Sequence, residues 1–195
     1  MKLTAATKIT LIRMLLIPFV ATSILYRRYG LALLLFLISG LSDLFDGLVA
    51  RKFHQKSRLG ALLDPMADKL LLSTSFVLLT IPSTGVTVSI PLWLTVIVFG
   101  RDILIVVSAV AIALTTGFTK FDPSIYGKSS TVVQIACVLG VLMVNYLRAY
   151  QPVLIPLFYV TFGLTLFSGI HYVYIFTKRF NMETEEAVKK DDLYN

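Results

Sequence analysis

The chain has 195 residues, of which 56% are hydrophobic and only 15% charged, and its formal net charge is +7. Soluble domains carry about 25% charged residues, so this composition excludes an ordinary soluble domain and indicates a membrane protein. The single cysteine, Cys137, excludes an internal disulfide and disfavours a zinc cluster. We attribute the positive charge to basic cytoplasmic loops of a membrane protein, and not to nucleic-acid binding.

Six apolar segments are each long enough to cross a bilayer, which takes about 20 residues of helix. In chain order they are residues 9–26, 31–50, 61–81, 90–115, 129–147 and 153–177. Helices are expected because lipid cannot satisfy open backbone groups. The sequence therefore predicts an all-α integral membrane bundle of six transmembrane helices, forming one domain over residues 1–180. Residues 181–195 are expected to be a polar cytoplasmic tail, with a composition that permits disorder.

The distribution of basic residues predicts how the bundle is oriented. If the N-terminus faces the cytoplasm, twelve Lys and Arg side chains lie on the inner side and three on the outer side. The inner set is Lys2, Lys8, Arg51, Lys52, Lys56, Arg58, Lys120, Lys128, Lys178, Arg179, Lys189 and Lys190, and the outer set is Arg27, Arg28 and Arg148. Because cytoplasmic loops are enriched in Lys and Arg, we expect both termini to be cytoplasmic.

Five of the eleven acidic residues lie within apolar segments, where an ionised carboxylate costs roughly 2.5–3.5 kcal/mol on insertion scales. They are Asp43, Asp46, Asp64, Asp68 and Asp102. The first two are three residues apart and the next two four apart, so each pair shares one helix face. Both pairs flank one short basic loop, and we expect them to converge near the cytoplasmic surface. Hard divalent cations would relieve the repulsion, and two such ions about 3.5–4 Å apart form a clamp for phosphoryl transfer.

The same residues form a motif that resembles a known family. Asp43, Asp46, Gly47, Ala50, Arg51, Gly60, Asp64 and Asp68 occupy every fixed position of D-x2-D-G-x2-A-R-x8-G-x3-D-x3-D. This pattern is similar to the signature of the CDP-alcohol phosphatidyltransferases. The resemblance also covers the six-helix arrangement and therefore most of the chain.

The resemblance implies a six-helix bundle, usually a homodimer, with a polar cavity open to the cytosol. It implies that Asp43, Asp46 and Asp64 bind two Mg²⁺ or Mn²⁺ ions, and that Asp68 lies near the metals and acts as the base. By the same resemblance, the CDP site is lined by Gly47, Ala50, Arg51 and Gly60. The implied reaction transfers a phosphatidyl group from CDP-diacylglycerol to an alcohol, with release of CMP. We expect a multi-pass protein of the cell membrane, which in bacteria is the inner membrane, with its active site facing the cytoplasm.

Three stretches bear on the acceptor alcohol. The run from Thr10 to Pro18 resembles the T-x2-R-x4-P stretch of phosphatidylglycerophosphate synthases, and residues 64–69 resemble the D-P-x-A-D-K form that these enzymes share with CDP-type cardiolipin synthases. Residues 127–131 resemble G-K-x-K-T, but Ser130 replaces the second lysine. Glycerol 3-phosphate ranks first because an anion pocket can form from Arg13, Arg101 and Lys128. Phosphatidylglycerol, the acceptor of cardiolipin synthases, ranks next.

Other interpretations of the charged residues stay open. Arg13 can extend to the cytoplasmic surface instead of binding a phosphate. Arg101 can equally form a structural tie to another helix. Intramembrane aspartates also suit a cation transporter, and CMP release from CDP-diacylglycerol with and without Mg²⁺ would distinguish that class from the enzyme.

Overall fold

In a computed structural model of the chain, the described residues are 5–53, 58–81, 86–116, 125–148 and 151–194. Within these ranges, the side chains of residues 5–9, 43–53, 58–65, 109, 111–116, 151, 176 and 178–194 lie outside the description. The described chain is all helical, with no strand in it. Its helices are α1 (Ala5–Leu25), α2 (Tyr29–Phe53), α3 (Arg58–Thr80), α4 (Leu92–Thr116), α5 (Ile125–Leu147), the short 3-10 helix η2 (Gln151–Val153) and α6 (Leu154–Tyr194).

The predicted all-α fold with six helices is confirmed, since each predicted segment overlaps one α-helix. Among the described residues, two stretches are long and apolar enough to cross a membrane, Ile125–Leu147 and Leu154–Ile175. The disorder that the tail composition permitted is not found, because α6 continues without a break to Tyr194. Glutamates at 185 and 186 precede lysines at 189 and 190 by four residues, a spacing that favours helix.

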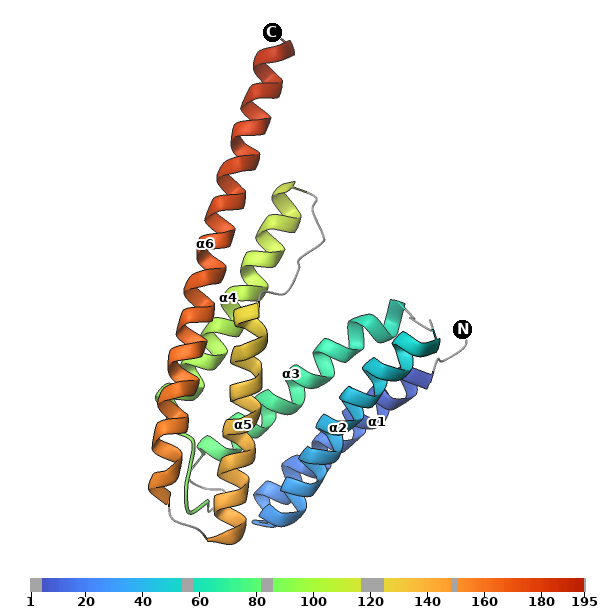
Figure 1. The fold of residues 1–195 in the computed structure, drawn as a ribbon, viewed down its shortest axis with the longest axis vertical. Helices are drawn as coiled ribbons and strands as arrows, with labels where there is room; N and C mark the ends of the chain where they lie inside the picture. The colour runs from blue at the N-terminus through green and yellow to red at the C-terminus, as the bar shows by residue number, and fades with distance from the viewer. Residues whose placement is uncertain (1–4, 54–57, 82–85, 117–124, 149–150, 195) are drawn as a thin grey trace.

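The helices form two groups that diverge toward one end of the molecule (Figure 1). In the first group, α1 packs against both α2 and α3, and in the second group α6 packs against both α4 and α5. Helix α5 also contacts α2 and α3, so it joins the two groups. The connections α1–α2 and α5–α6 lie at the lower end in Figure 1, where the groups are close together.

Two tight helix ends and one close approach shape this lower end. The α1 helix ends in a Schellman motif, in which Arg28 N donates to Ser23 O at 2.8 Å and Arg27 N to Ile24 O at 3.0 Å. Arg27 takes the left-handed backbone conformation that this motif requires, with φ 60°. A few residues on, a Cβ at Gly30 would lie 2.6 Å from Cε2 of Tyr146, so a larger residue here would require the Tyr146 ring to shift.

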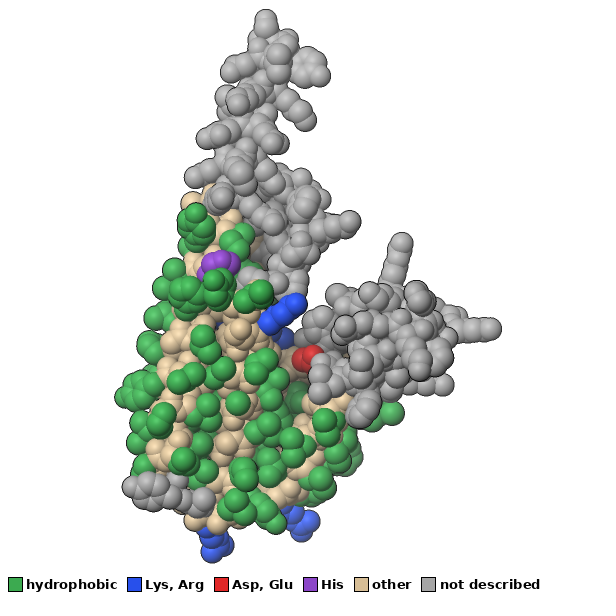
Figure 2. All heavy atoms as spheres, viewed as in Figure 1, with side chains coloured by type: hydrophobic (Ala, Val, Ile, Leu, Met, Phe, Trp, Pro, Cys, Tyr) green, Lys and Arg blue, Asp and Glu red, His purple; other side chains and the backbone are tan. Residues whose placement is uncertain are grey.

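One buried polar side chain fixes the segment between α3 and α4. Asn145 accepts hydrogen bonds from the backbone N–H groups of Thr87 and Val88, at 2.7 and 3.1 Å, and donates to Val88 O at 2.9 Å. Around it the interior is apolar, with fully buried side chains such as Phe76, Leu94 and Val141. The outer surface is apolar as well, and Figure 2 shows hydrophobic side chains over most of the described face.

Candidate functional site

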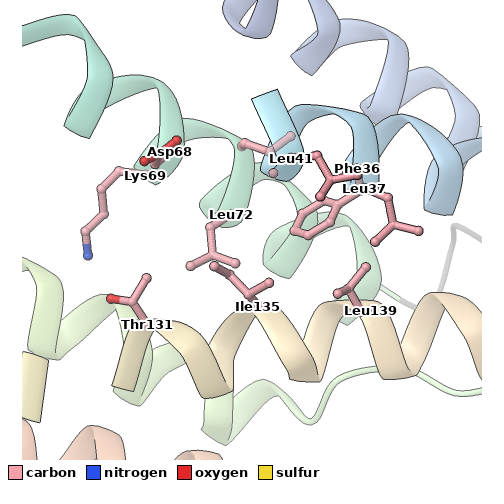
Figure 3. Close-up of a pocket in the computed structure, with 11 residues that line it drawn as sticks. Phe36, Leu37, Leu41, Asp68, Lys69, Leu72, Thr131, Ile135 and Leu139 are labelled. Carbon is pink, nitrogen blue, oxygen red and sulfur yellow. The ribbon is translucent and has the colours of Figure 1, made fainter. Parts of the chain in front are cut away.

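A cavity of about 500 Å³ lies between α2, α3 and α5. Most of its wall is apolar, and its polar side chains come from Asp68, Lys69 and Thr131 (Figure 3). Figure 3 places these three at one end, with Phe36 and Leu139 at the other. The apolar lining is formed by Phe36, Leu37, Gly40, Leu41, Leu71, Leu72, Ile135 and Leu139. The cavity therefore offers an apolar chamber with a charged end.

The acid at this charged end is held by a buried arginine. Arg13 Nη1 on α1 donates to Asp68 Oδ1 on α3 at 2.5 Å. The Arg13 side chain is only 1% exposed, whereas the Asp68 side chain is 46% exposed. The Arg13 guanidinium is thus the buried ion-pair partner of the Asp68 carboxylate. The structure therefore places Arg13 inside the bundle beside Asp68, and not on the surface.

A second charged group extends from the cavity into the α4–α6 interface. Lys69 forms an ion pair with Asp102 of α4, and Asp102 Oδ1 also accepts a hydrogen bond from Arg101 Nη1 at 2.8 Å. The buried Arg101 guanidinium donates to Ser168 Oγ on α6 from Nη2 at 2.9 Å and from Nε at 3.3 Å. It also lies over the Tyr172 ring, 5.8 Å from the ring centroid. These three charged side chains therefore link α3, α4 and α6.

Helix α5 contributes a buried polar contact rather than a second lysine. Ser130 is fully buried, and its hydroxyl lies 3.2 Å from Thr165 Oγ1 and accepts from Gln134 Nε2 at 3.2 Å. The position that departs from G-K-x-K-T thus faces the α5–α6 interface. Lys128, two residues earlier, is exposed.

The remaining residues of the motif lie on α2 and α3, two of the three helices that border the cavity. The backbone positions of Asp43, Asp46, Gly47, Ala50 and Arg51 belong to the last turns of α2, and those of Gly60 and Asp64 to the first turns of α3. Their side chains lie outside the description. Among the side chains that the structure describes, no group of three potential metal ligands occurs. The expected metal and CDP sites at these positions therefore stay predictions.

Two features of the site were not predicted from the sequence. The pairing of Lys69 with Asp102 joins residues on different helices, and the support of Arg101 by Ser168 spans 67 positions. Ser168 and Gly169 are adjacent small residues in the apolar part of α6, which is a weak indication of a close helix contact there. Arg101 does form the tie to another helix that was considered for it, through its hydrogen bonds to Ser168 of α6.

Comparison with known proteins identifies the family. The family model described as CDP-alcohol phosphatidyltransferase matches residues 3–174. A CDP-diacylglycerol--glycerol-3-phosphate 3-phosphatidyltransferase of Haemophilus influenzae is 31% identical over 178 residues, covering 90% of this chain and 94% of that protein. The protein of the same name from Aquifex aeolicus is 35% identical over 151 residues, covering 75% of this chain and 82% of its own length.

A probable cardiolipin synthase (CMP-forming) of Drosophila melanogaster is 30% identical over 190 residues, covering 88% of this chain and 57% of that protein. These matches favour the enzyme over the cation transporter, because the family model covers residues 3–174, which include all five aspartates of the apolar segments. The chain belongs to the CDP-alcohol phosphatidyltransferase family.

Proposed function

We propose that this protein transfers the phosphatidyl group of CDP-diacylglycerol to an alcohol, first of all glycerol 3-phosphate, and releases CMP. The observation that carries the proposal is the cavity of about 500 Å³ with an apolar wall and Asp68 at its charged end. An apolar chamber beside a carboxylate suits a substrate that has acyl chains on one side and a reacting phosphate on the other. Relatives that carry the name of this activity support it.

The donor set that the motif supplies fits divalent cations. Asp68 is a half-exposed carboxylate on the cavity, and carboxylate oxygens are the ligands that Mg²⁺ prefers. Asp64 precedes Asp68 by one helical turn, and Asp43 follows the cavity residue Gly40 by three positions, so helical register favours the same face for each. We propose that Asp43, Asp46, Asp64 and Asp68 hold two ions, Mg²⁺ or Mn²⁺. When bound, such ions would neutralise the donor diphosphate.

In the reaction that we propose, Asp68 accepts the proton of the acceptor hydroxyl. The hydroxyl oxygen then forms a bond to the phosphorus that carries diacylglycerol, and the bond from that phosphorus to the CMP oxygen breaks. Arg13 orients the Asp68 carboxylate from the buried side. The CDP moiety would lie along Gly47, Ala50, Arg51 and Gly60, because small residues leave room for a nucleotide and the guanidinium of Arg51 can bind its phosphates.

The acceptor would bind at the charged end of the cavity. Of the three cations expected there, Arg13 is adjacent to Asp68, and Lys128 is exposed near the start of α5. Arg101 is buried against Ser168 and Asp102, so we propose that it supports the site through Asp102. Phosphatidylglycerol is the second candidate acceptor, and the cardiolipin synthase relative from Drosophila melanogaster favours it.

We also propose that all six helices cross the cell membrane, with both termini and the active site on the cytoplasmic side. Large apolar side chains with more than half of their area exposed, such as Leu15, Phe19, Leu92 and Ile103, support a lipid-facing surface. A homodimer is part of the proposal, and cross-linking in membranes tests it.

The experiment supplies purified protein in detergent with CDP-diacylglycerol, Mg²⁺ and either glycerol 3-phosphate or phosphatidylglycerol. The expected result is CMP release together with phosphatidylglycerophosphate, identified by its mass. Cardiolipin as the product would show that the acceptor is phosphatidylglycerol and not glycerol 3-phosphate. If neither acceptor gives CMP above a reaction without protein, the proposed function is wrong.

A further inference from the structure

We propose that Lys69, held in place by Asp102, is the residue that recognises the anionic phosphate group of the acceptor. This inference rests on the proposed function and adds a specificity-determining residue to it. The group recognised is a phosphate-type anion, which is a free monoester in glycerol 3-phosphate and a diester in phosphatidylglycerol.

Lys69 lines the cavity next to Asp68, and Figure 3 shows its side chain extending from α3 toward the part of α5 that carries Thr131. Its side chain is 44% exposed, so a ligand in the cavity can reach it. An ammonium has three N–H donors, and the bond to Asp102 Oδ1 uses one of them. Among the described contacts, no other bond of Lys69 competes with a ligand.

Asp102 is a fixed anchor and not a mobile surface partner. Its side chain is 18% exposed, and the same oxygen that binds Lys69 accepts from Arg101 at 2.8 Å. Arg101 is in turn held by Ser168 of α6 at 2.9 Å. Because each link in this chain of contacts is more buried than the one before it, the position of the ammonium is set by the α4–α6 interface.

Among the side chains that the structure describes, the charges at this end of the cavity favour an anion. Arg13 and Asp68 together carry no formal net charge, whereas the group of Lys69, Asp102 and Arg101 carries one net positive charge. Ser130, where the resembled stretch has a lysine, is buried and faces Thr165. Position 130 of α5 therefore supplies no cation, whereas Lys69 of α3 does.

The simpler interpretation is that Lys69 and Asp102 only tie α3 to α4. A half-exposed ion pair of that kind contributes little stability, typically about 0–1 kcal/mol in water. The two interpretations differ in what they predict for catalysis. A structural tie affects both substrates equally, whereas an anion contact affects the acceptor alone.

The test compares Lys69→Met, Lys69→Arg and Asp102→Asn with the wild type, using both acceptors separately. Lys69→Met keeps the length of the side chain but removes its charge. We expect the KM for the acceptor to rise by about ten-fold or more, because a charge-assisted hydrogen bond is lost, while the KM for CDP-diacylglycerol stays within about two-fold. Lys69→Arg should recover most of the loss, and Asp102→Asn should raise the acceptor KM by a smaller factor. Arg28→Ala, an exposed cation at the far end of the helices, is the control.

Binding of glycerol 3-phosphate and of phosphatidylglycerol to the protein without donor is measured by calorimetry in parallel. Weaker binding in Lys69→Met supports the inference, and the acceptor whose affinity falls identifies the source of the anion. An acceptor KM and affinity equal to those of the wild type would overturn it, as would an equal rise in both KM values. If Lys69→Met does not fold, the acceptor KM and affinity of Asp102→Asn are compared with those of the wild type by the same criteria. A wild type that releases no CMP refutes the proposed function, while the calorimetry still tests Lys69.

Discussion

Replacing Ser168 by alanine tests whether the α4–α6 interface holds Arg101 as the structure indicates. Ser168 is fully buried, and its hydroxyl accepts both the Nη2–H and the Nε–H of Arg101, at 2.9 and 3.3 Å. Alanine removes the acceptor and leaves two N–H groups of a buried cation without it. A hydrogen bond to a charged group contributes about 1.5–3 kcal/mol, and interhelical bonds between neutral groups in membranes average only about 0.6 kcal/mol. We count the two contacts as one bond because they share one oxygen, and we expect a loss of about 1.5–3 kcal/mol.

Ser75→Ala is the matched control, because Ser75 is equally buried but its hydroxyl donates to Leu71 O of its own helix, at 2.8 Å. That carbonyl accepts a helical hydrogen bond as well, so removing the hydroxyl should change stability little. The free energy of unfolding is measured for both variants by SDS titration in mixed micelles. Equal losses in the two variants would refute the role of Ser168 in holding Arg101.

Three further predictions concern the motif and the packing. Asp43→Asn, Asp46→Asn and Asp64→Asn should each abolish CMP release at saturating Mg²⁺ while the protein still folds, and near-normal turnover would remove that residue from the metal site. Gly30→Ala should destabilise the fold by about 1 kcal/mol, at the low end of overpacking costs because the exposed Tyr146 ring can shift, and adding Tyr146→Ala should remove the incremental effect of Gly30→Ala. Ser130→Lys should lower the unfolding temperature, because it buries a charge against Thr165; improved use of glycerol 3-phosphate in a stable variant would contradict this.

The six helices could be predicted from the sequence because their apolar runs and the charged breaks between them are local features. The predicted ends differ from the observed ones by a few residues, except in α6, where a polar composition did not interrupt the helix. We attribute the helix in that segment to helical propensity and to the spacing of opposite charges, and neither is visible as a run of apolar residues. The family also follows from a local motif, since its eight fixed residues lie close together in the chain.

The contacts that shape the charged end of the cavity could not be predicted in this way. Arg13 and Asp68 are 55 positions apart, and Arg101 and Ser168 are 67 apart. Helical periodicity indicates which residues share a face, but it does not indicate which helices pack together or at what depth two charges meet. Of the three basic residues grouped as one anion pocket, Arg13 lies beside Asp68, and Lys128 is exposed. Arg101 is buried in the α4–α6 interface and donates to Gly127 O, next to Lys128, at 3.4 Å, and the pocket itself stays a prediction.

We propose that chemistry takes place at the carboxylate end of the cavity, with Asp68 as the base. The most direct measurement is the rate of CMP release by Asp68→Asn, together with its affinity for CDP-diacylglycerol in the presence of Mg²⁺. Asparagine keeps the shape of the side chain but cannot accept the proton of the hydroxyl. We predict that turnover is lost while the dissociation constant of the donor stays within a few-fold of the wild-type value. Turnover close to that of the wild type would contradict the account, and a parallel loss of affinity and rate would make Asp68 a ligand instead of the base.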